Sequence, residues 1–202
     1  MKKLSLKLAL LAVCMVLGAT SHAGALEGVE AYEKGDYPVA LGEFRPLAEE
    51  GNEKAQFIVG LMYENGNGVL QDYKEAASWY MKAAEQGLAQ AQFNLAMMYR
   101  KGKGVTRDYD ESLKWLLKAA EQGHARAQFT LGVIYQNGFG VQRDYGEAVA
   151  WYLKAAEQEV AQAQFNLGMM YHRGQGVTRD YKEALKWLNR AVRNLSPEKE
   201  MF

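Results

Sequence analysis

The sequence has a single cysteine, Cys14, which lies inside an apolar N-terminal run. Loss of this run would leave no cysteine, so disulfide-bonded scaffolds and thiol enzymes are excluded for the remaining chain. A lipoprotein signal would need a small residue before Cys14, and Val13 stands there instead. Stability must therefore come from packed apolar surface, for which a hydrophobic content of 49% is ample.

The chain also lacks an excess of either charge. Its 202 residues contain 24 Lys and Arg against 24 Asp and Glu, a formal net charge of zero. Removal of Lys2, Lys3 and Lys7 with the N-terminal run would leave 21 basic and 24 acidic residues, a net of −3. Nucleic-acid-binding domains normally show a strong basic excess. We therefore expect no nucleic-acid partner and no bulk attraction of the protein to anionic membranes.

Residues typical of catalysis are scarce as well. Beyond residues 1–23 the only histidines are His124 and His172, and we expect both to be solvent-exposed. No serine lies in a G-x-S-x-G motif, and the Gly-x-Gly pairs lack the lysine and the serine or threonine of a phosphate-binding loop. No metal-ligand spacing is present. The sequence predicts a non-enzymatic protein without a cofactor or metal.

The N-terminus is typical of an export signal. A basic start precedes Leu8–Leu17, an apolar run that is short for a membrane span. Ser21 and Ala23 place small residues at the −3 and −1 positions of a cleavage site, so we predict a signal peptide over residues 1–23. Cleavage after Ala25 and an uncleaved anchor are the alternatives. We expect a periplasmic or secreted protein without stable membrane insertion after cleavage.

The rest of the chain is dominated by a 36-residue repeat. The copies that begin at Ala89 and Ala161 match at 23 of 36 positions. A fixed period of this size indicates a stacked array in which each unit buries its apolar face against its neighbours. We divide the chain into a divergent N-terminal capping unit (24–52), four repeats (53–88, 89–124, 125–160 and 161–196) and a C-terminal tail (197–202).

Each repeat is predicted to form a helix, a loop and a second helix. In the second copy, Ala91, Leu95, Met98 and Tyr99 recur at the spacing of one helix face. Two glycines after this helix supply the backbone freedom for a turn. An aspartate followed three residues later by a glutamate then resembles a capping box, in which each residue binds a backbone N–H of the other. Each such cap should contribute about 0.5–2 kcal/mol. The cap aspartates are Asp72, Asp108, Asp144 and Asp180.

The second helices carry all the tryptophans of the protein. Each is followed four residues later by an alanine, which allows helices to approach while the large ring fills the gap between repeats. We interpret these rings as structural, and a carbohydrate-binding platform is the alternative. They are Trp79, Trp115, Trp151 and Trp187.

The second helices end at glycine in two copies, Gly87 and Gly123, but at Glu159 in the third. A glutamate in the left-handed conformation would cost about 1–2 kcal/mol. We therefore predict a local irregularity between the third and fourth copies.

The repeats resemble a known family. The third copy, Ala125–Ala156, follows the pattern A-x-A-x-F-x-L-G-x-x-Y-x-x-G-x-G-V-x-x-D-Y-x-x-A-x-x-W-x-x-K-A-A almost without exception. Departures in the second copy include Ala96 for the glycine and Ser112 for the alanine. It is similar to the Sel-one-like repeat, a branch of the tetratricopeptide superfamily. The resemblance implies a right-handed α-solenoid of antiparallel helix pairs whose concave side, lined by first helices, binds partners.

Members of this family are generally adaptors in protein complexes, and exported bacterial members resemble envelope or host-contact factors. One subgroup, the Helicobacter cysteine-rich proteins, has been linked to β-lactam binding and hydrolysis. This chain lacks the paired cysteines of that subgroup, so the assignment is not transferred.

The candidate partner-binding surface follows from helical geometry. At about 100° per residue, repeat positions two, five, nine, twelve and thirteen lie opposite the core positions of the first helix. The polar candidates differ between copies, which fits a surface that binds a partner asymmetrically and equally fits unconstrained solvent positions. They are Lys54, Gln90, Arg100, Lys101, Arg126, Gln136, Asn137, His172 and Arg173.

Apolar residues share this sector. Phe57, Phe93, Phe129 and Phe165 either pack between repeats or line an open groove, and both interpretations remain. A groove flanked by Arg100, Lys101, Arg126 and Arg173 would favour acidic or C-terminal-carboxylate peptides.

The sequence thus predicts a non-enzymatic scaffold that binds a protein or peptide on the concave first-helix face. A peptidoglycan- or glycan-binding envelope factor is the first alternative, and a β-lactam-binding hydrolase is the second. The partner and the oligomeric state are not predicted.

Overall fold

The computed structural model describes residues 19–195, with side chains from Gly24 onward. Within this range the chain forms ten α-helices and no strand, which confirms the predicted all-α fold. The predicted signal residues 1–18, Ser196 and the tail 197–202 lie outside the described residues. None of the described helices is long and apolar enough to cross a membrane.

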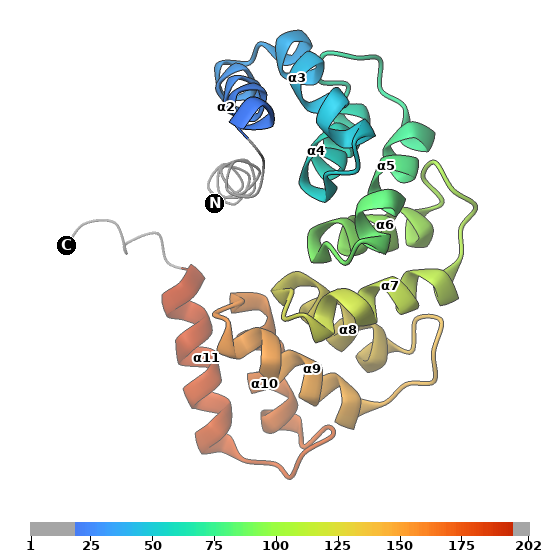
Figure 1. Ribbon diagram of the computed structural model, residues 1–202. Helices are drawn as coiled ribbons and strands as arrows, with labels where there is room; N and C mark the ends of the chain where they lie inside the picture. The colour runs from blue at the N-terminus through green and yellow to red at the C-terminus, as the bar shows by residue number, and fades with distance from the viewer. Residues whose placement is uncertain (1–18, 196–202) are drawn as a thin grey trace, which may run out of the picture. The chain divides into compact units, whose positions relative to one another are not determined.

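The chain divides into two compact units, the first ending at Asp108 and the second beginning at Tyr109. Unit 1 contains α2 (Ala19–Lys34), α3 (Tyr37–Glu49), α4 (Glu53–Asn65), α5 (Tyr73–Glu85) and α6 (Ala89–Lys101). Unit 2 contains α7 (Tyr109–Glu121), α8 (Ala125–Asn137), α9 (Tyr145–Glu157), α10 (Ala161–Arg173) and α11 (Tyr181–Leu195). Within each unit every helix packs on the next along the chain (Figure 1), which is the packing of an all-α solenoid.

The divergent N-terminal unit forms two helices joined by a tight turn. Gly35, at φ +82°, ends α2, and the side chain of Asp36 caps α3, which has Pro38 in its first turn. Fully buried Ala25 and Phe44 belong to the same core cluster. Helix α2 begins at Ala19 and so includes the predicted cleavage point, and a cut there would retain Gly24–Lys34. The cleavage site itself stays a prediction.

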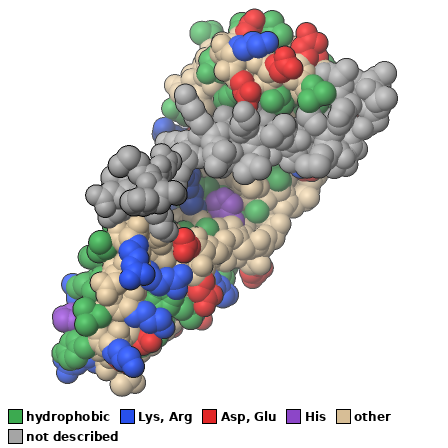
Figure 2. All heavy atoms as spheres, turned by 90° about the vertical axis from the view of Figure 1, so that its left-hand side faces the viewer, with side chains coloured by type: hydrophobic (Ala, Val, Ile, Leu, Met, Phe, Trp, Pro, Cys, Tyr) green, Lys and Arg blue, Asp and Glu red, His purple; other side chains and the backbone are tan. Residues whose placement is uncertain are grey.

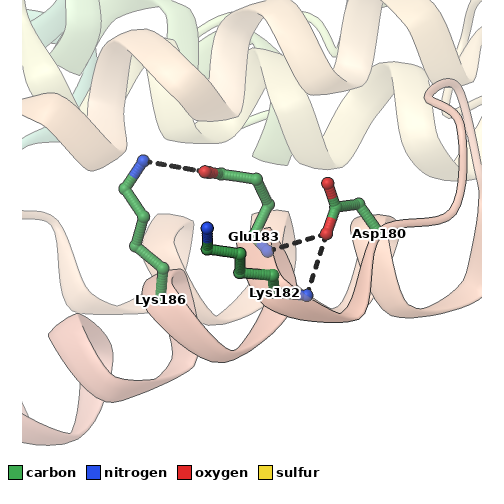
Figure 3. A network of polar contacts seen from close by, with 4 residues as sticks. All are labelled: Asp180, Lys182, Glu183 and Lys186. Atoms are coloured by element: carbon green, nitrogen blue, oxygen red, sulfur yellow. Dashed lines mark hydrogen bonds and ion pairs between the residues drawn. The ribbon is translucent and has the colours of Figure 1, made fainter.

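Aspartate caps begin the second helices, but they form only half of the expected capping box. In Asp180 one carboxylate oxygen accepts hydrogen bonds from the backbone N–H groups of Lys182 (2.8 Å) and Glu183 (3.0 Å), as Figure 3 shows. The Glu183 side chain pairs with Lys186 at 3.0 Å rather than returning to the cap. The backbone N–H of Asp180 instead donates to the carbonyl of Tyr171 in the preceding helix (3.1 Å).

The same arrangement recurs along the chain, so the reciprocal capping box was wrong. Asp72 and Asp144 cap α5 and α9 in the same way. Because a first-helix tyrosine carbonyl already holds the N–H of each cap aspartate, no donor is left for the glutamate. The backbone bonds are Asp72 to Tyr63, Asp108 to Tyr99 and Asp144 to Tyr135, each 3.0 Å.

The predicted irregularity after the third repeat was also wrong. Glu159 adopts φ +63° and is the one non-glycine residue with positive φ in the described range. Its N–H donates to Ala156 and that of Val160 to Ala155, which repeats the bonds that Gly123 and His124 make to Ala120 and Ala119. Packing of α10 on α9 therefore imposes the glycine turn on a glutamate, at a local cost of about 1–2 kcal/mol.

The loops inside the repeats approach neighbouring backbone closely. A Cβ atom added to Gly104 would lie 1.9 Å from the carbonyl oxygen of Tyr73, and one on Gly176 would lie 2.2 Å from that of Tyr145. Both glycines have φ near +70°. Only glycine satisfies both requirements, because it has no side chain and tolerates positive φ.

Each tryptophan is buried against its own helix layer, with exposed fractions of 5–8%. The Lys or Arg three residues after each tryptophan lies over its ring. The Lys82 ammonium, for example, is 3.9 Å from the centre of the Trp79 ring. Rings in this environment pack between helices and present no open face on which a sugar could stack.

Buried glutamines link consecutive repeats, and the sequence analysis did not identify them. The side-chain amide of Gln128 donates to the carbonyl of Ala120 at the end of α7 (3.0 Å) and accepts from Gln158 (2.7 Å). The last carbonyls of a helix have no partner within it, so each glutamine satisfies one of them. The equivalent bonds are Gln56 to Ala48, Gln92 to Ala84 and Gln164 to Ala156.

Candidate partner-binding surface

The nine predicted partner-binding residues all lie on first helices but not in one patch. Lys54, Gln90 and Arg126 lie in the first turns of α4, α6 and α8. The other six lie in the last turns of α6, α8 and α10, ten or more residues further on. That separation is about 15 Å along each helix, at 1.5 Å per residue. The six are Arg100, Lys101, Gln136, Asn137, His172 and Arg173.

The last turns differ in charge between alternate helices. Helices α6 and α10 end in basic residues, Arg100 with Lys101 and His172 with Arg173, and positive charge is favourable there beside the helix carbonyls. Helix α8 ends instead at Asn137, whose side-chain amide donates to the carbonyl of Val133 at 2.8 Å. Asn137 is therefore engaged by its own helix, whereas Lys101, His172 and Arg173 are exposed.

In unit 1, a polar cluster lies between the first helices. The hydroxyl of buried Tyr80 donates to the carboxylate of Glu64 at 2.6 Å, and its other hydrogen-bond partner is the side chain of Asn94. Burial raises the pKa of Tyr80 well above its usual value, and the Glu64 charge adds to this effect. Glu64 and Asn94 also line a cavity of about 60 Å³ with Met97, Met98, Lys101 and Lys103. We call Glu64, Tyr80, Asn94 and Lys101 the Tyr80 cluster.

Unit 2 contains the equivalent cluster 72 residues later. The hydroxyl of Tyr152 donates to the amide oxygen of Gln136 at 2.6 Å and is also hydrogen-bonded by Asn166. Burial raises the pKa of Tyr152 to about 12, so the hydroxyl stays protonated. Arg173 lies two helical turns after Asn166, on the same face of α10. We call Gln136, Tyr152, Asn166 and Arg173 the Tyr152 cluster.

Five members of these clusters were missed from the sequence: Glu64, Tyr80, Asn94, Tyr152 and Asn166. Their signal was present, because several positions of the repeat alternate from one copy to the next. The second and fourth copies carry Leu116 and Leu188 where the first and third carry the tyrosines. A 72-residue period would have indicated two equivalent polar clusters.

The four phenylalanines do not share one role. Phe57 is 8% exposed, and its ring centre lies 5.7 Å from that of Tyr80. Phe129 is half-buried at 5.9 Å from Tyr152. Phe165 is 49% exposed. Phe57 and Phe129 therefore pack against second-helix tyrosines, whereas Phe165 presents an open apolar surface.

The two histidines differ, and the expected exposure of His124 was wrong. His172 is exposed and lies edge-on to Tyr181, with ring centres 5.4 Å apart. His124 is half-buried and caps α8, where Nδ1 accepts from the N–H of Ala127 at 3.2 Å. Burial, assisted by the charge of Arg126, lowers the pKa of His124 to about 4. Among the described residues no group of three His, Cys, Asp or Glu side chains could hold a metal ion.

Comparison with known proteins agrees with this geometry. The family model for the Sel1 repeat matches residues 53–88, 89–124, 125–160 and 161–194. The chain belongs to the Sel1 repeat family. Proteins of this family are generally scaffolds for protein–protein interaction.

Solved structures of Sel1 repeat proteins are similar to this chain. A Sel1 repeat protein from Oxalobacter formigenes is 39% identical with a TM-score of 0.79, over 84% of this chain and 69% of that one. The protein c5321, a protective antigen of uropathogenic Escherichia coli strains, is 43% identical with a TM-score of 0.81. That match covers 86% of this chain but only 38% of c5321.

A more distant structure shows the fold alone. A Sel1 repeat protein from Klebsiella pneumoniae is 24% identical with a TM-score of 0.55, over 87% of this chain and 90% of that one. A search of curated proteins finds no match.

Proposed function

We propose that this protein is an exported scaffold that binds a protein or peptide partner on its first-helix surface, through the Tyr80 and Tyr152 clusters. The observation that carries the proposal is the recurrence of one arrangement in both units. Each cluster combines a protonated tyrosine hydroxyl from a second helix with an asparagine amide and a cation from the first helix that follows it.

The chemistry of each cluster suits an extended polypeptide. An asparagine amide can donate to one peptide carbonyl and accept from one N–H, so Asn94 and Asn166 offer the main-chain contacts. Half-buried Met97 and Met169 offer adaptable apolar contacts beside them. The cations at the helix ends would bind a carboxylate of the partner.

The two clusters differ in charge, and an acidic group of the partner should therefore bind in unit 2. Glu64 places a carboxylate in the Tyr80 cluster, whereas the neutral amide of Gln136 stands in its place in the Tyr152 cluster. Arg173 therefore faces no acidic member of its own cluster. A partner carboxylate should prefer this cluster, and Arg173 should contribute more than Lys101.

Affinity co-purification from envelope extract tests the proposal. The quadruple variant Arg100→Ala, Lys101→Ala, Arg126→Ala, Arg173→Ala should lose a partner that the parent retains. A matched control replaces four exposed basic residues of the loops and second helices by alanine, namely Lys74, Arg107, Arg143 and Arg179. Equal capture by parent and quadruple variant would refute a role for the first-helix cations.

Binding of the captured partner to purified protein then separates the clusters. We expect Asn166→Ala and Arg173→Ala each to weaken binding about tenfold, the range of one charge-assisted hydrogen bond. Asn94→Ala and Lys101→Ala should have smaller effects. A larger effect in unit 1 would show that Glu64 does not repel the partner, and would reverse the assignment of the acidic group.

A further inference from the structure

Helix α11 exposes an apolar stripe on the side where earlier second helices are covered. Leu185, Val192 and Leu195 are 61%, 62% and 60% exposed. At about 100° per residue they lie within an arc of about 80°, together with half-buried Leu188. Phe165 of α10 is 49% exposed. In the third repeat the equivalent ring, Phe129, contacts Tyr152. In the fourth repeat Leu188 stands in place of this tyrosine. The stripe and Phe165 together form what we call the α11 face.

In earlier repeats the positions of Leu185 and Val192 are covered. Ala84, Ala120 and Ala156 are 1%, 2% and 0% exposed where α11 has Val192. The position of Leu185 carries Ala77, which is 4% exposed, and half-buried Leu113 and Val149. The next first helix packs on these side chains, as α6 does on α5 and α10 on α9. Val192 is larger than the alanines at its position and is therefore poorly suited to hold another helix of the repeat at the same distance.

The charge of α11 also differs from that of the other second helices. Lys182, Lys186, Arg190 and Arg193 face a single acidic residue, Glu183, which gives α11 a net charge of +3 (four minus one). Arg193 stands where the earlier repeats have Glu85, Glu121 and Glu157. Helix α9, with one lysine and two glutamates, has a net charge of −1.

The cations border the apolar stripe on one side. Lys182 and Arg193, both exposed, lie about 60° and 80° around the helix from Leu185. Figure 2 shows Lys and Arg side chains gathered beside hydrophobic ones over the part of unit 2 where α11 lies. An exposed apolar stripe with a basic border is the pattern of helices that lie in the interface of an anionic bilayer.

We propose that the α11 face binds peripherally to the surface of an anionic lipid bilayer. Leu185, Val192, Leu195 and Phe165 enter the interface between headgroups and acyl chains, and Lys182 and Arg193 contact the anionic headgroups. The contact is local, because the chain as a whole carries no excess of positive charge. It uses one first-helix residue, Phe165, and does not depend on the function proposed for the Tyr80 and Tyr152 clusters.

Vesicle co-sedimentation tests this proposal, using vesicles of phosphatidylglycerol and phosphatidylcholine in equal parts and vesicles of phosphatidylcholine alone. Parent and variants are used in the exported form with N-termini matched by mass spectrometry, so that any N-terminal contribution is equal. The apolar variant is Leu185→Gln, Val192→Gln, Leu195→Gln, and the charge variant is Lys182→Glu, Arg193→Glu. The control is Leu70→Gln, Lys74→Glu, since Leu70 is 91% exposed in a unit 1 loop and Lys74 is also exposed.

We expect the parent to bind the anionic vesicles, and both α11 variants to lose at least about tenfold in partition coefficient while the control is unchanged. Thermal unfolding by circular dichroism verifies that the variants are folded. The proposal is overturned if the parent stays in solution, if the α11 variants bind as the parent does, or if the control loses binding equally. It is also overturned if light scattering shows a parent dimer that dissociates in the apolar variant without vesicle binding, because a second copy would then cover the face.

Discussion

The loop inside a repeat and the junction between repeats both use residues with positive φ, yet they differ in what they tolerate. At Gly104, in a loop, an added Cβ would lie 1.9 Å from a carbonyl oxygen of the neighbouring repeat. At Gly87, in a junction, the same atom would meet nothing within 4 Å. The junction position is occupied by glutamate in the third repeat, whereas all four loops retain glycine.

The difference separates two free-energy costs of a side chain at positive φ, namely backbone strain and steric overlap with the neighbouring repeat. A side chain at a junction is strained only by its own backbone conformation, which costs about 1–2 kcal/mol. A side chain in a loop would also push two repeats apart, and the packed array resists this. The loops are thus held by steric contact, whereas the junctions are held by hydrogen bonds from His124 and the buried glutamines.

The largest expected effect is that of Gly104→Ala. Backbone strain of about 1–2 kcal/mol and overpacking of about 1–3 kcal/mol should together lower the free energy of unfolding by about 2–5 kcal/mol. Urea denaturation measures the change. Gly87→Ala is the matched control and should lose only the strain component, so equal losses at the two positions would remove the distinction between loop and junction.

The next largest effect concerns pH at the junction before α8. His124 has an ordinary pKa of 6.5 when unfolded and about 4 when folded. Between these values the unfolded chain binds a proton that the folded chain does not, so stability falls as pH drops from 6.5 to 4, by at most about 3 kcal/mol. His124→Asn keeps a capping acceptor without titrating and should flatten this dependence in denaturation series from pH 7 to pH 4. An unchanged pH dependence in the variant would assign the effect to other groups.

A smaller effect is expected from Gln128→Met, which keeps the length of the side chain but removes its amide. The Ala120 carbonyl and the Gln158 amide would each lose a buried partner, for a loss of about 1–3 kcal/mol. Thermal and urea unfolding measure it. Gln162→Met is the control, because Gln162 is exposed on the first-helix surface. Equal stability of the Gln128 variant and the parent would show that the hydrogen bonds which these two groups keep to Gly123 are sufficient.

The smallest effect is a gain. Glu159→Gly removes the strained conformation while the ion contact of Glu159 with Arg190, at 4.0 Å between exposed groups, contributes little. The variant should be more stable by about 1 kcal/mol in urea denaturation. A loss of stability would mean that the contact with Arg190 outweighs the strain.

The helices were predictable because their signals are local. Asp144 and the glycine pairs mark helix ends by bonds and angles within a few residues, and the fourfold repetition removes ambiguity. The outcome at Glu159 was not predictable, because the local preference of glutamate was overridden by the packing of α10 on α9. The capping box failed for a similar reason, since the tyrosine carbonyl that occupies the N–H of Asp144 comes from nine residues earlier in the chain.

The candidate site was predictable only in part. Helical angles placed Lys101 and Arg173 on the solvent side of first helices, where the structure has them exposed. Angles could not show that Tyr80, from a second helix, reaches Glu64 and Asn94 on two different first helices. That contact depends on the distance between neighbouring repeats.

By itself the sequence determined the class of fold, the helix pairs and the membership in a family of scaffolds, because a 36-residue period repeats every local signal. The tertiary structure alone decided which side chains meet: the Tyr80 and Tyr152 clusters, the burial of His124, the glutamine bonds between repeats and the open α11 face. The physical reason is range. Helix ends depend on backbone groups a few residues apart, whereas burial and polar contacts depend on helices that packing brings together from distant parts of the chain.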